Sequence, residues 1–437
     1  MKIAIIGAGY TGLAAGYFLS KSGHAVTIFE RDTEAGGLAA GFRPVRRRGG
    51  KTWRWNLEKA YHHLFENDID ILSLSKELEI SGELLLKRPL TAIFHNGKIS
   101  QFDSPSTLLS FPGLSIVSKV RTAFLLGFLR INPFWKPLEK ITAQSLFKAI
   151  GGEESWRVLW EPLMRGKFGS YEDTVPASWL WARVTKRTPR LYYFKGGFFT
   201  FVAALVKAIK KQKGSICLDT EVTSITQAKS GFQVSYGDTS ELFDRVVLTV
   251  PSPVVKKIVP NFPRIFTDKL LSIDHLSAQT LILQTDTPIL DKTYCLNIND
   301  RSFPFLAVVA HTNFMDKQYY GGKHITYIGN YLPPDHPYLK MTKDQLLRLF
   351  LPYIKKIQYS VFSIHNSFLF SAPFAQPVHT LNYSKLAPKF VTPIQGIYIA
   401  SLDSIVPWDR GTNYAVKLGK DVAEFIATNT VQRHHEN

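Results

Sequence analysis

The chain begins with a strand, helix and strand pattern. Residues 2–6 form a short apolar run, which is typical of a buried parallel strand. The stretch 13–23 predicts a helix that ends at Gly23, because glycine commonly closes a helix. Residues 25–30 predict a second strand. This order of elements predicts the start of an α/β domain with a parallel sheet.

The same pattern returns close to the end of the chain. Residues 397–400 predict a strand, and the turn residues Pro407, Gly411 and Asn413 follow it. A helix with its apolar residues on one face comes next. A second element of this kind either builds a second site or completes the first.

A hairpin and a helical region are predicted after the first element. Residues 85–103 read as two strands around Asn96-Gly97, a dipeptide that favours a type I′ turn. Residues 105–190 are rich in Leu, Trp and Arg and predict a largely helical region.

The second half of the chain predicts strands again. Residues 196–225 predict a helix with a basic tail and then a strand centred on Val222. Residues 243–251 predict a buried strand that ends at a proline. The region 257–390 is mixed, and its clearest strands are 280–285 and 324–332.

Composition and charge narrow the compartment and the partners. The chain has 437 residues and 45% hydrophobic content, which predicts a globular protein of two or three substructures. Cys217 and Cys295 make no disulfide or metal pattern, so we expect no metal and a reducing, cytoplasmic compartment. The apolar start is too short for a signal peptide, and no run approaches the roughly 18 apolar residues of a spanning helix. The net charge of +18 implies a polyanionic partner, which is an acidic substrate, a membrane surface or a nucleic acid.

A glycine fingerprint lies between the first strand and the first helix. Gly7, Gly9 and Gly12 have the GxGxxG spacing, in which the glycines allow a tight turn, close approach to a pyrophosphate, and helix–strand packing. Glu30 ends the second strand, where a carboxylate accepts hydrogen bonds from a ribose 2′-OH. Arg31 would suit the 2′-phosphate of NADP, but Glu30 would repel that phosphate. The fingerprint predicts a dinucleotide site and does not separate NAD from FAD.

The stretch "RDTEAGGLAAGF" that follows carries the adjacent glycines Gly36 and Gly37, which would bring a second stretch of backbone against the dinucleotide. Together with the C-terminal element, this arrangement resembles the flavoprotein superfamily of amine oxidases, protoporphyrinogen oxidase and UDP-galactopyranose mutase. The resemblance extends through "WEPLMRGKFG", "KGGFFTF", "APFAQPV" and "PWDRGTNYAV". It implies FAD as the cofactor. We expect non-covalent binding, because no Cys or His stands next to the C-terminal turn to form a bond to the flavin.

The resemblance also implies the fold class. We expect an α/β protein with a discontinuous Rossmann-like FAD-binding domain, a mixed-sheet substrate domain and a helical insert. The second strand–turn–helix element then completes one flavin site, because its helix N-terminus suits the anionic reduced flavin. The expected parts are FAD-binding segments 1–84, 191–256 and 391–437, a hairpin and helical insert 85–190, and a substrate-domain sheet 257–390.

The cofactor residues are carried over from the same resemblance. One departure is that many relatives have Gly-Asp after the last strand, where this chain has "ASLDSIVPWDRG". Asp403 or Asp409 could take the role of that acid, and we favour Asp409 because it directly precedes the helix. The cofactor-binding candidates are Gly7, Gly9, Gly12, Glu30, Arg31, Gly36, Gly37, Leu38, Val222, Asp409, Arg410, Gly411, Thr412 and Asn413.

Substrate-facing residues are predicted from three stretches. His63-Leu64-Phe65 matches a His-x-Phe segment that lies against the flavin ring in the mutases, and the alternative for His62 and His63 is a structural histidine. Arg165 and Lys167 bind an anionic group or are solvated surface charges. Gln376, Tyr383 and Tyr331 are further candidates, and buried tyrosines are commonly core residues. The catalytic candidates are His63, His62, Tyr331 and Arg165. The arginines 46–48 predict a solvated loop.

Three functions compete. The first is an FAD-dependent oxidoreductase that accepts a hydride from an amine, a porphyrinogen-like compound or a polyprenyl-type lipid, with oxygen, a quinone or a protein as electron acceptor. The second is a non-redox enzyme resembling UDP-galactopyranose mutase, which uses reduced flavin on a nucleotide-linked or lipid-linked sugar, although the full arginine and tyrosine pattern of the mutases is missing. The third is a non-enzymatic flavin or nucleic-acid binder, and no recognisable DNA or RNA module supports it, so no nucleic-acid partner is expected.

The segment 115–137 predicts contact with an anionic membrane. It combines an apolar helix with basic and aromatic residues, as an interfacial helix requires. The resembled protoporphyrinogen oxidases attach to membranes through their helical insert, and the alternative is a helix that covers the substrate-domain core. We expect peripheral binding on the cytoplasmic face. The residues concerned are Lys119, Arg121, Arg130, Lys136, Phe111, Phe124, Phe128, Phe134 and Trp135.

Overall fold

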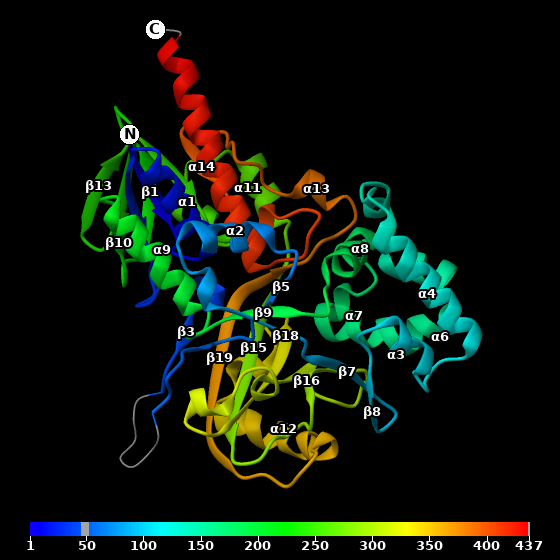
Figure 1. Ribbon diagram of the computed structural model, residues 1–437. Coiled ribbons are helices and arrows are strands. Elements are labelled where there is room, and N and C mark those ends of the chain that lie inside the picture. Colours follow the sequence, from blue (N-terminus) through cyan, green and yellow to red (C-terminus); the bar gives the residue numbers. More distant parts are fainter. Residues whose placement is uncertain (45–51, 436–437) are drawn as a thin grey trace.

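The computed structural model describes residues 1–44 and 52–435, with side chains to residue 428. The predicted loop of arginines 46–48 lies outside the described residues. Figure 1 shows a parallel sheet and its helices in the upper part of the view, near the N-terminus of the chain. A second large sheet lies below it, and a group of helices lies to one side.

The first sheet is parallel and draws its five strands from three distant parts of the chain. Its order is β10-β2-β1-β14-β20, and each neighbouring pair is parallel. The buried apolar run at 2–6 and the C-terminal strand are therefore parts of one sheet, as predicted. The strands are β1 (Lys2–Ile6), β2 (Ala25–Phe29), β10 (Ser215–Cys217), β14 (Arg245–Leu248) and β20 (Ile397–Ile399).

Three helices cover this sheet. α1 (Tyr10–Lys21) packs against both α9 (Phe199–Lys211) and α14 (Thr412–His435). The contact between α1 and α14 is very close, because a Cβ on Gly419 would lie 2.4 Å from the carbonyl oxygen of Thr11. The N-terminal and C-terminal helices therefore form one packed layer.

The strand predicted around Val222 lies in another sheet. Val222 begins β11 (Val222–Gln227), which pairs with β12 (Phe232–Tyr236) in a three-stranded antiparallel sheet completed by β13 (Thr239–Phe243). The strand that joins the parallel sheet is the short β10, which the sequence analysis did not separate from β11. The buried strand predicted at 243–251 is confirmed by β14.

The second large sheet is mixed and has seven strands, in the order β19-β15-β18-β17-β16-β7-β8. All neighbouring pairs are antiparallel except β16 and β7. The predicted hairpin is confirmed: His95 pairs with Lys98, and Asn96 and Gly97 have φ of 49° and 74°. The strands are β7 (Leu90–His95), β8 (Lys98–Gln101), β15 (His275–Thr285), β16 (Thr293–Ile298), β17 (Ala307–Ala310), β18 (His324–Leu332) and β19 (Ile364–Pro377).

The region 105–190 is helical, as predicted, and has its own apolar core rich in tryptophan. The short sheet of β5 (Leu64–Phe65), β9 (Leu191–Phe194) and β6 (Leu84–Lys87) lies where the chain enters and leaves this insert. Its helices are α3 (Pro105–Ser110), α4 (Ile116–Ile131), α5 (Ala143–Leu146), α6 (Glu153–Ser155), α7 (Glu161–Phe168) and α8 (Ala177–Lys186). The other elements are β3 (Gly41–Phe42), β4 (Leu57–Glu58), α2 (Ile69–Glu77), α10 (Ser252–Ile258), α11 (Arg264–Leu271), α12 (Lys343–Ile357) and α13 (Tyr383–Leu386).

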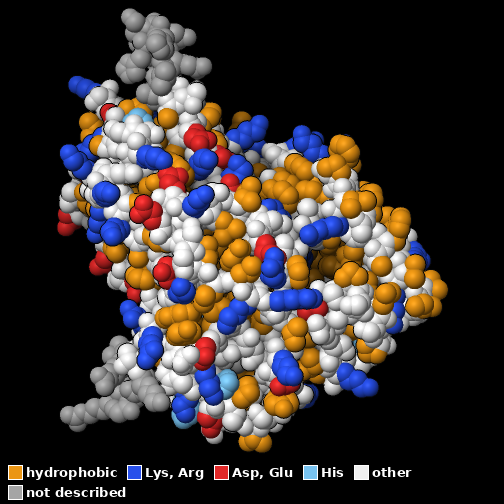
Figure 2. Space-filling model, viewed as in Figure 1, with side chains coloured by type: hydrophobic (Ala, Val, Ile, Leu, Met, Phe, Trp, Pro, Cys, Tyr) orange, Lys and Arg blue, Asp and Glu red, His pale blue; other side chains and the backbone are white. Residues whose placement is uncertain are grey.

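Helix α4 has one buried face and one exposed face. Leu125 and Leu129 are fully buried in the insert core, whereas Phe124 is 67% exposed and Ile131 is 81% exposed. Figure 2 shows hydrophobic side chains gathered at the edge of the molecule where Figure 1 places α4. Among the described residues, no helix is long and apolar enough to cross a bilayer.

These elements agree with the predicted fold class: a parallel sheet built from distant segments, a mixed sheet, and a helical insert. The domain limits given above stay a prediction.

Candidate active site

Two glycine loops meet at the carboxyl end of β1. Gly7 has φ of +106°, and a Cβ on Gly12 would lie 1.9 Å from the Gly7 carbonyl oxygen, so α1 starts directly against the strand. Gly36 forms a parallel bridge with Gly9, and its N–H donates to the Ala8 carbonyl at 2.9 Å. The adjacent glycines therefore bring a second stretch of backbone against the first loop. Their contact with a dinucleotide stays a prediction.

Space for a ligand remains in front of these loops. A Cβ on Gly9 would meet only the Cα of Gly37, at 3.9 Å, so no protein contact requires glycine there. Gly37, in contrast, has φ of +57° and packs against Gly9, while Leu38 continues the short turn. No side chain caps the N-terminus of α1, so its first N–H groups are available to an anion. This arrangement fits the pyrophosphate of a dinucleotide such as FAD.

Glu30 lies directly after β2, and the residue is only 9% exposed. It accepts hydrogen bonds from the N–H of Ala8 at 2.8 Å and of Asp32 at 3.0 Å. These bonds hold the carboxylate beside the first glycine loop, where a ribose hydroxyl would reach it. The Arg31 side chain is exposed and pairs with Asp32, which directs it away from this carboxylate. Val222 is buried in the apolar cluster that also contains Phe29, so the structure places it near the end of β2.

The C-terminal turn brings Asp409 to the centre of a polar group. Asp409 Oδ2 accepts from Lys167 Nζ at 2.6 Å, and Oδ1 accepts from Gln376 Nε2 at 3.3 Å. Burial raises the pKa of Asp409, but the Lys167 charge outweighs this effect and lowers it to about 2. The alternative acid, Asp403, is fully buried and bonded to Ser252 and His275.

The four residues after Asp409 differ from one another in their contacts. Arg410 donates from Nε to Gln376 Oε1 at 2.9 Å, and its guanidinium lies over the Tyr331 ring. Gly411 and Thr412 are half-buried at the start of α14. The Asn413 side chain is bound to α2, because its Oδ1 accepts from the N–H of Asp70 at 2.9 Å. Only the backbone of Asn413 therefore remains for the cofactor role predicted for it.

The two histidines lie beside this group and stay neutral. The pKa of His62 is lowered to about 4; burial is the main cause, and the Arg410 charge acts in the same direction. His62 Nδ1 donates to the Ala60 carbonyl at 2.7 Å, which leaves Nε2 as an acceptor. Burial, followed by the nearby Arg187 charge, lowers the pKa of His63 to about 3. His63 Nδ1 lies 3.3 Å from the hydroxyl of Tyr294.

Two of the other candidates have structural partners. Tyr383 is a core residue whose hydroxyl donates to the Asp403 carbonyl at 3.0 Å. Arg165 forms a surface ion pair with Glu172, to which it donates from Nε at 3.0 Å. This exposed position does not suit the catalytic role predicted for Arg165. Its neighbour Lys167 points inward instead, because the two residues lie on different faces of α7.

Two arginines of the site were missed by the sequence analysis. Arg183 lies on α8 over the Trp179 ring, and Arg187 follows directly after this helix. Trp179 and Arg183 are four residues apart and share a face of α8, and Arg187 follows at the same spacing, as the first residue beyond the helix. A tryptophan and two arginines at this regular spacing are the signal that could have revealed them. We call Lys167, Arg183, Arg187 and Arg410 the cation cluster.

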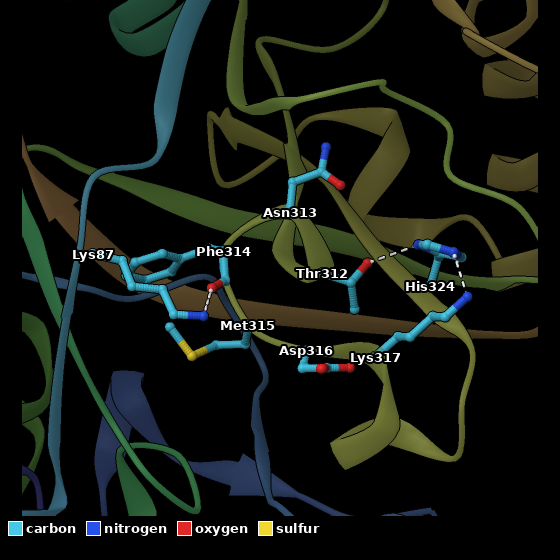
Figure 3. Close-up of a pocket in the computed structure, with 8 residues that line it drawn as sticks. All are labelled: Lys87, Thr312, Asn313, Phe314, Met315, Asp316, Lys317 and His324. Carbon is cyan, nitrogen blue, oxygen red and sulfur yellow. Dashed lines mark hydrogen bonds between the residues drawn. The ribbon is translucent and has the colours of Figure 1, made fainter.

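A recess of about 340 Å³ lies elsewhere, beside the strand β18. Figure 3 shows that several of its polar groups bind each other: Lys87 donates to the Phe314 carbonyl, and Thr312 and Lys317 contact the ring of His324. None of its lining residues belongs to the cation cluster.

Comparisons with known proteins give a family match and several similar folds. The model of the family described as flavin containing amine oxidoreductase matches residues 10–426. Coproporphyrinogen III oxidase of Staphylococcus aureus is 24% identical over 335 residues, which cover 67% of this chain and 69% of that protein. A provisionally assigned protoporphyrinogen oxidase from Exiguobacterium sp. has a similar fold, with a TM-score of 0.78, 17% identity, and coverage of 98% of this chain and 99% of that chain. Cyclohexylamine oxidase from Brevibacterium oxydans has a TM-score of 0.69 at 13% identity, with coverage of 98% and 99%.

Proposed function

The chain belongs to the flavin-containing amine oxidoreductase family, and on this premise we propose that it oxidises a C–H bond of an amine, a porphyrinogen-like compound or a polyprenyl-type lipid. FAD supplies the hydride acceptor when it is bound. We further propose oxygen or a quinone as the final electron acceptor. The observation that carries the proposal is the meeting of both glycine loops with Glu30 at the carboxyl edge of the parallel sheet.

The chain's own residues divide the work. Gly9, Gly36, Gly37 and Glu30 would hold the dinucleotide half of FAD, and the N-terminus of α14 would complete the site. The positive end of a helix favours negative charge in a ligand, as the reduced flavin carries.

Side chains near the C-terminal turn would position the substrate. His62 and His63 are neutral near pH 7, so His62 Nε2 can accept a proton from a substrate N–H or O–H group. The rings of Trp179 and Tyr331 line the same region as the cation cluster and would exclude water from the reacting group.

The test is anaerobic reduction of the bound flavin. The FAD-loaded protein is mixed without oxygen with putrescine, with coproporphyrinogen or with a reduced polyprenyl lipid, and the flavin absorbance is followed. Loss of the oxidised-flavin band with one class identifies the substrate, and readmission of oxygen or a quinone identifies the acceptor. If dithionite bleaches the flavin and none of the three classes does, the proposed reaction is wrong.

We also propose that the enzyme binds peripherally to the cytoplasmic face of an anionic membrane through α4. The exposed face of this helix would enter the interface, with Lys119 and Lys136 near the headgroups. Two of the basic residues that were predicted to contact the membrane, Arg121 and Arg130, bind backbone carbonyls instead. Arg121 donates to the Ala149 and Ile150 carbonyls. Arg130 similarly donates to three carbonyls around the end of α8.

The aromatic residues of this segment divide in the same way. Phe111 is buried, and Trp135 packs against the insert core. Phe124, Phe128 and Phe134 are exposed and would insert. The sugar-mutase alternative is not favoured by any contact described above.

A further inference from the structure

The cation cluster gathers positive charges from three separate segments. Lys167 Nζ lies 4.7 Å from the centre of the Trp179 ring, and Arg183 Cζ lies 5.5 Å from the same centre. Lys167 and Arg410 share the Tyr331 ring in the same way, at 5.7 Å and 5.0 Å. The insert helices α7 and α8 and the turn before α14 therefore deliver cations to one place.

The positive charge of the cluster exceeds the negative charge beside it. Asp409 pairs with Lys167. In residues 1–44 and 52–435, no carboxylate forms an ion pair with Arg183, Arg187 or Arg410. Arg410 has a neutral partner, Gln376. Three cations therefore lie together without a matching anion.

The charges of the cluster act on each other. The pKa of Lys167 is lowered to about 7; burial is the main cause, the Arg183 and Arg410 charges act in the same direction, and Asp409 opposes them. The Arg183 charge is also the main cause that lowers the pKa of Arg187 to about 9. Gathering like charges in a partly buried space is costly unless an anion neutralises them.

Solvent can reach this space from one side. Arg187 is exposed and Arg183 is half-buried, whereas Lys167 is only 5% exposed. An anionic group could therefore enter past Arg187 and reach the inner cations. The FAD pyrophosphate does not account for the cluster, because the glycine loops and α1 are assigned to it above, and a reduced flavin would offset one charge only.

We propose that the cation cluster is a substrate-specificity site that binds an oxyanion of the substrate, a carboxylate or a phosphate, beside the reacting centre. This inference rests on the proposed oxidoreductase function and narrows it. The planar forks of Arg183 and Arg187 suit two-pronged hydrogen bonding to such groups. A protonated amine is repelled by the same charges, so the site selects against amine substrates and for an acidic porphyrinogen or a lipid phosphate.

The test is binding of paired probes to the oxidised, FAD-loaded protein. Coproporphyrin is compared with its neutral methyl ester, and farnesyl phosphate with farnesol, by the change in flavin fluorescence. The acidic member of at least one pair binds more tightly than its neutral form, on the order of tenfold or more. A preference within the porphyrin pair identifies a carboxylate substrate, and a preference within the farnesyl pair identifies a phosphate. Equal binding of acid and neutral forms in both pairs overturns the proposal.

Variants locate the effect. Arg187→Gln and Arg183→Gln each weaken the preferred acid on the order of tenfold, while FAD content stays at the wild-type level. Arg187 is the safer position, because it is an exposed residue and its guanidinium forms no ion pair among the described residues. Arg190→Gln is the matched control, since Arg190 is exposed, close in sequence and paired with Glu66. Wild-type affinity in the double variant Arg183→Gln/Arg187→Gln contradicts the proposal.

These measurements are independent of turnover. If no candidate reduces the flavin, the proposed reaction fails, and the binding of the probes still decides the role of the cluster. If the flavin is reduced and the acidic probes show no preference, the reaction stands and the anion site is wrong.

Discussion

Gly9 is a residue whose lack of a side chain is explained by a ligand rather than by the protein. The fold alone would accept a Cβ at this position, since the nearest atom is 3.9 Å away. We predict that Gly9→Val fills the space in front of α1 and weakens FAD by roughly 10-fold to 100-fold, as overpacking of about 1–3 kcal/mol implies. The flavin content of the purified protein measures this, and Gly82→Val is the control, because a Cβ on Gly82 meets nothing within 4 Å. A fully yellow Gly9→Val protein would contradict the assignment.

Glu58 is a buried acid that makes stability depend on pH. It is fully buried and accepts hydrogen bonds from Phe198 N at 2.7 Å and the Tyr193 hydroxyl at 2.8 Å. Burial is the main cause that raises its pKa from 4.5 to about 7. Between these values the folded state binds more protons than the unfolded state, so this contribution to stability falls as pH rises through the window.

We predict that Glu58→Gln removes this dependence. Between pH 5 and pH 8, the free energy of unfolding of the wild type should fall relative to that of the variant by roughly 3 kcal/mol at most. This is the free energy that corresponds to the rise in the pKa of Glu58. Urea unfolding of both FAD-loaded proteins at pH 5, 6.5 and 8 measures the difference, and other titrating groups cancel in it. Two curves that stay parallel across this range would show that Glu58 does not titrate there.

The sequence predicted the position of single residues well where that position depends on neighbouring residues in the chain. Glu30 follows a recognisable strand and a glycine fingerprint, and its carboxylate lies at the first loop as expected. Arg165 and Lys167 show where prediction from the sequence stops. The two basic residues belong to one segment, but they lie on different faces of α7, and only Lys167 meets the distant partner Asp409. The spacing of Arg183 from Trp179 is visible in the sequence, but the electrostatic effect of Asp409 on Arg183 comes from a residue far away in the chain, which no local pattern reveals.

At the scale of elements, long or strongly patterned segments were predictable and short ones were not. The hairpin at Asn96-Gly97 and the long strand β18 follow from turn chemistry and apolar pattern. The three-residue strand β10 was missed, because its place in the sheet depends on pairing with β2 rather than on its own sequence. The sequence analysis therefore predicted a single strand around Val222 where the structure has both β10 and β11.

Helix α4 carries the prediction that belongs to this scale. Phe124→Ser/Phe128→Ser should reduce co-sedimentation with anionic vesicles at low salt by about tenfold, because two exposed rings no longer enter the interface. Binding of the wild type should need anionic lipid and fall as salt rises. Ile265→Ser is the matched control, since Ile265 is 87% exposed on α11. If both variants bind like the wild type, the exposed face of α4 has another partner.

At the scale of the molecule, the parallel sheet joins three distant segments, and the proposed dinucleotide site is where they meet. We predict that FAD stabilises the whole fold, by about 2.7 kcal/mol when free FAD is at a hundred times its dissociation constant. The midpoint of thermal unfolding should therefore rise with FAD concentration. Gly9→Val should show a clearly smaller rise over the same range, because its affinity for FAD is weaker. A wild-type midpoint that is independent of FAD would mean that the cofactor does not bridge these segments.

The close packing of α1 against α14 also sets an order of events during synthesis. A ribosome releases α1 early, but α14, against which it packs, is the last helix of the described chain to emerge. Until then the nascent polypeptide has the glycine loops without the C-terminal turn that carries Asp409 and Arg410. We therefore expect the flavin to be acquired late in biogenesis, because a chain that stops before residue 412 lacks the helix N-terminus that we propose completes the cofactor site.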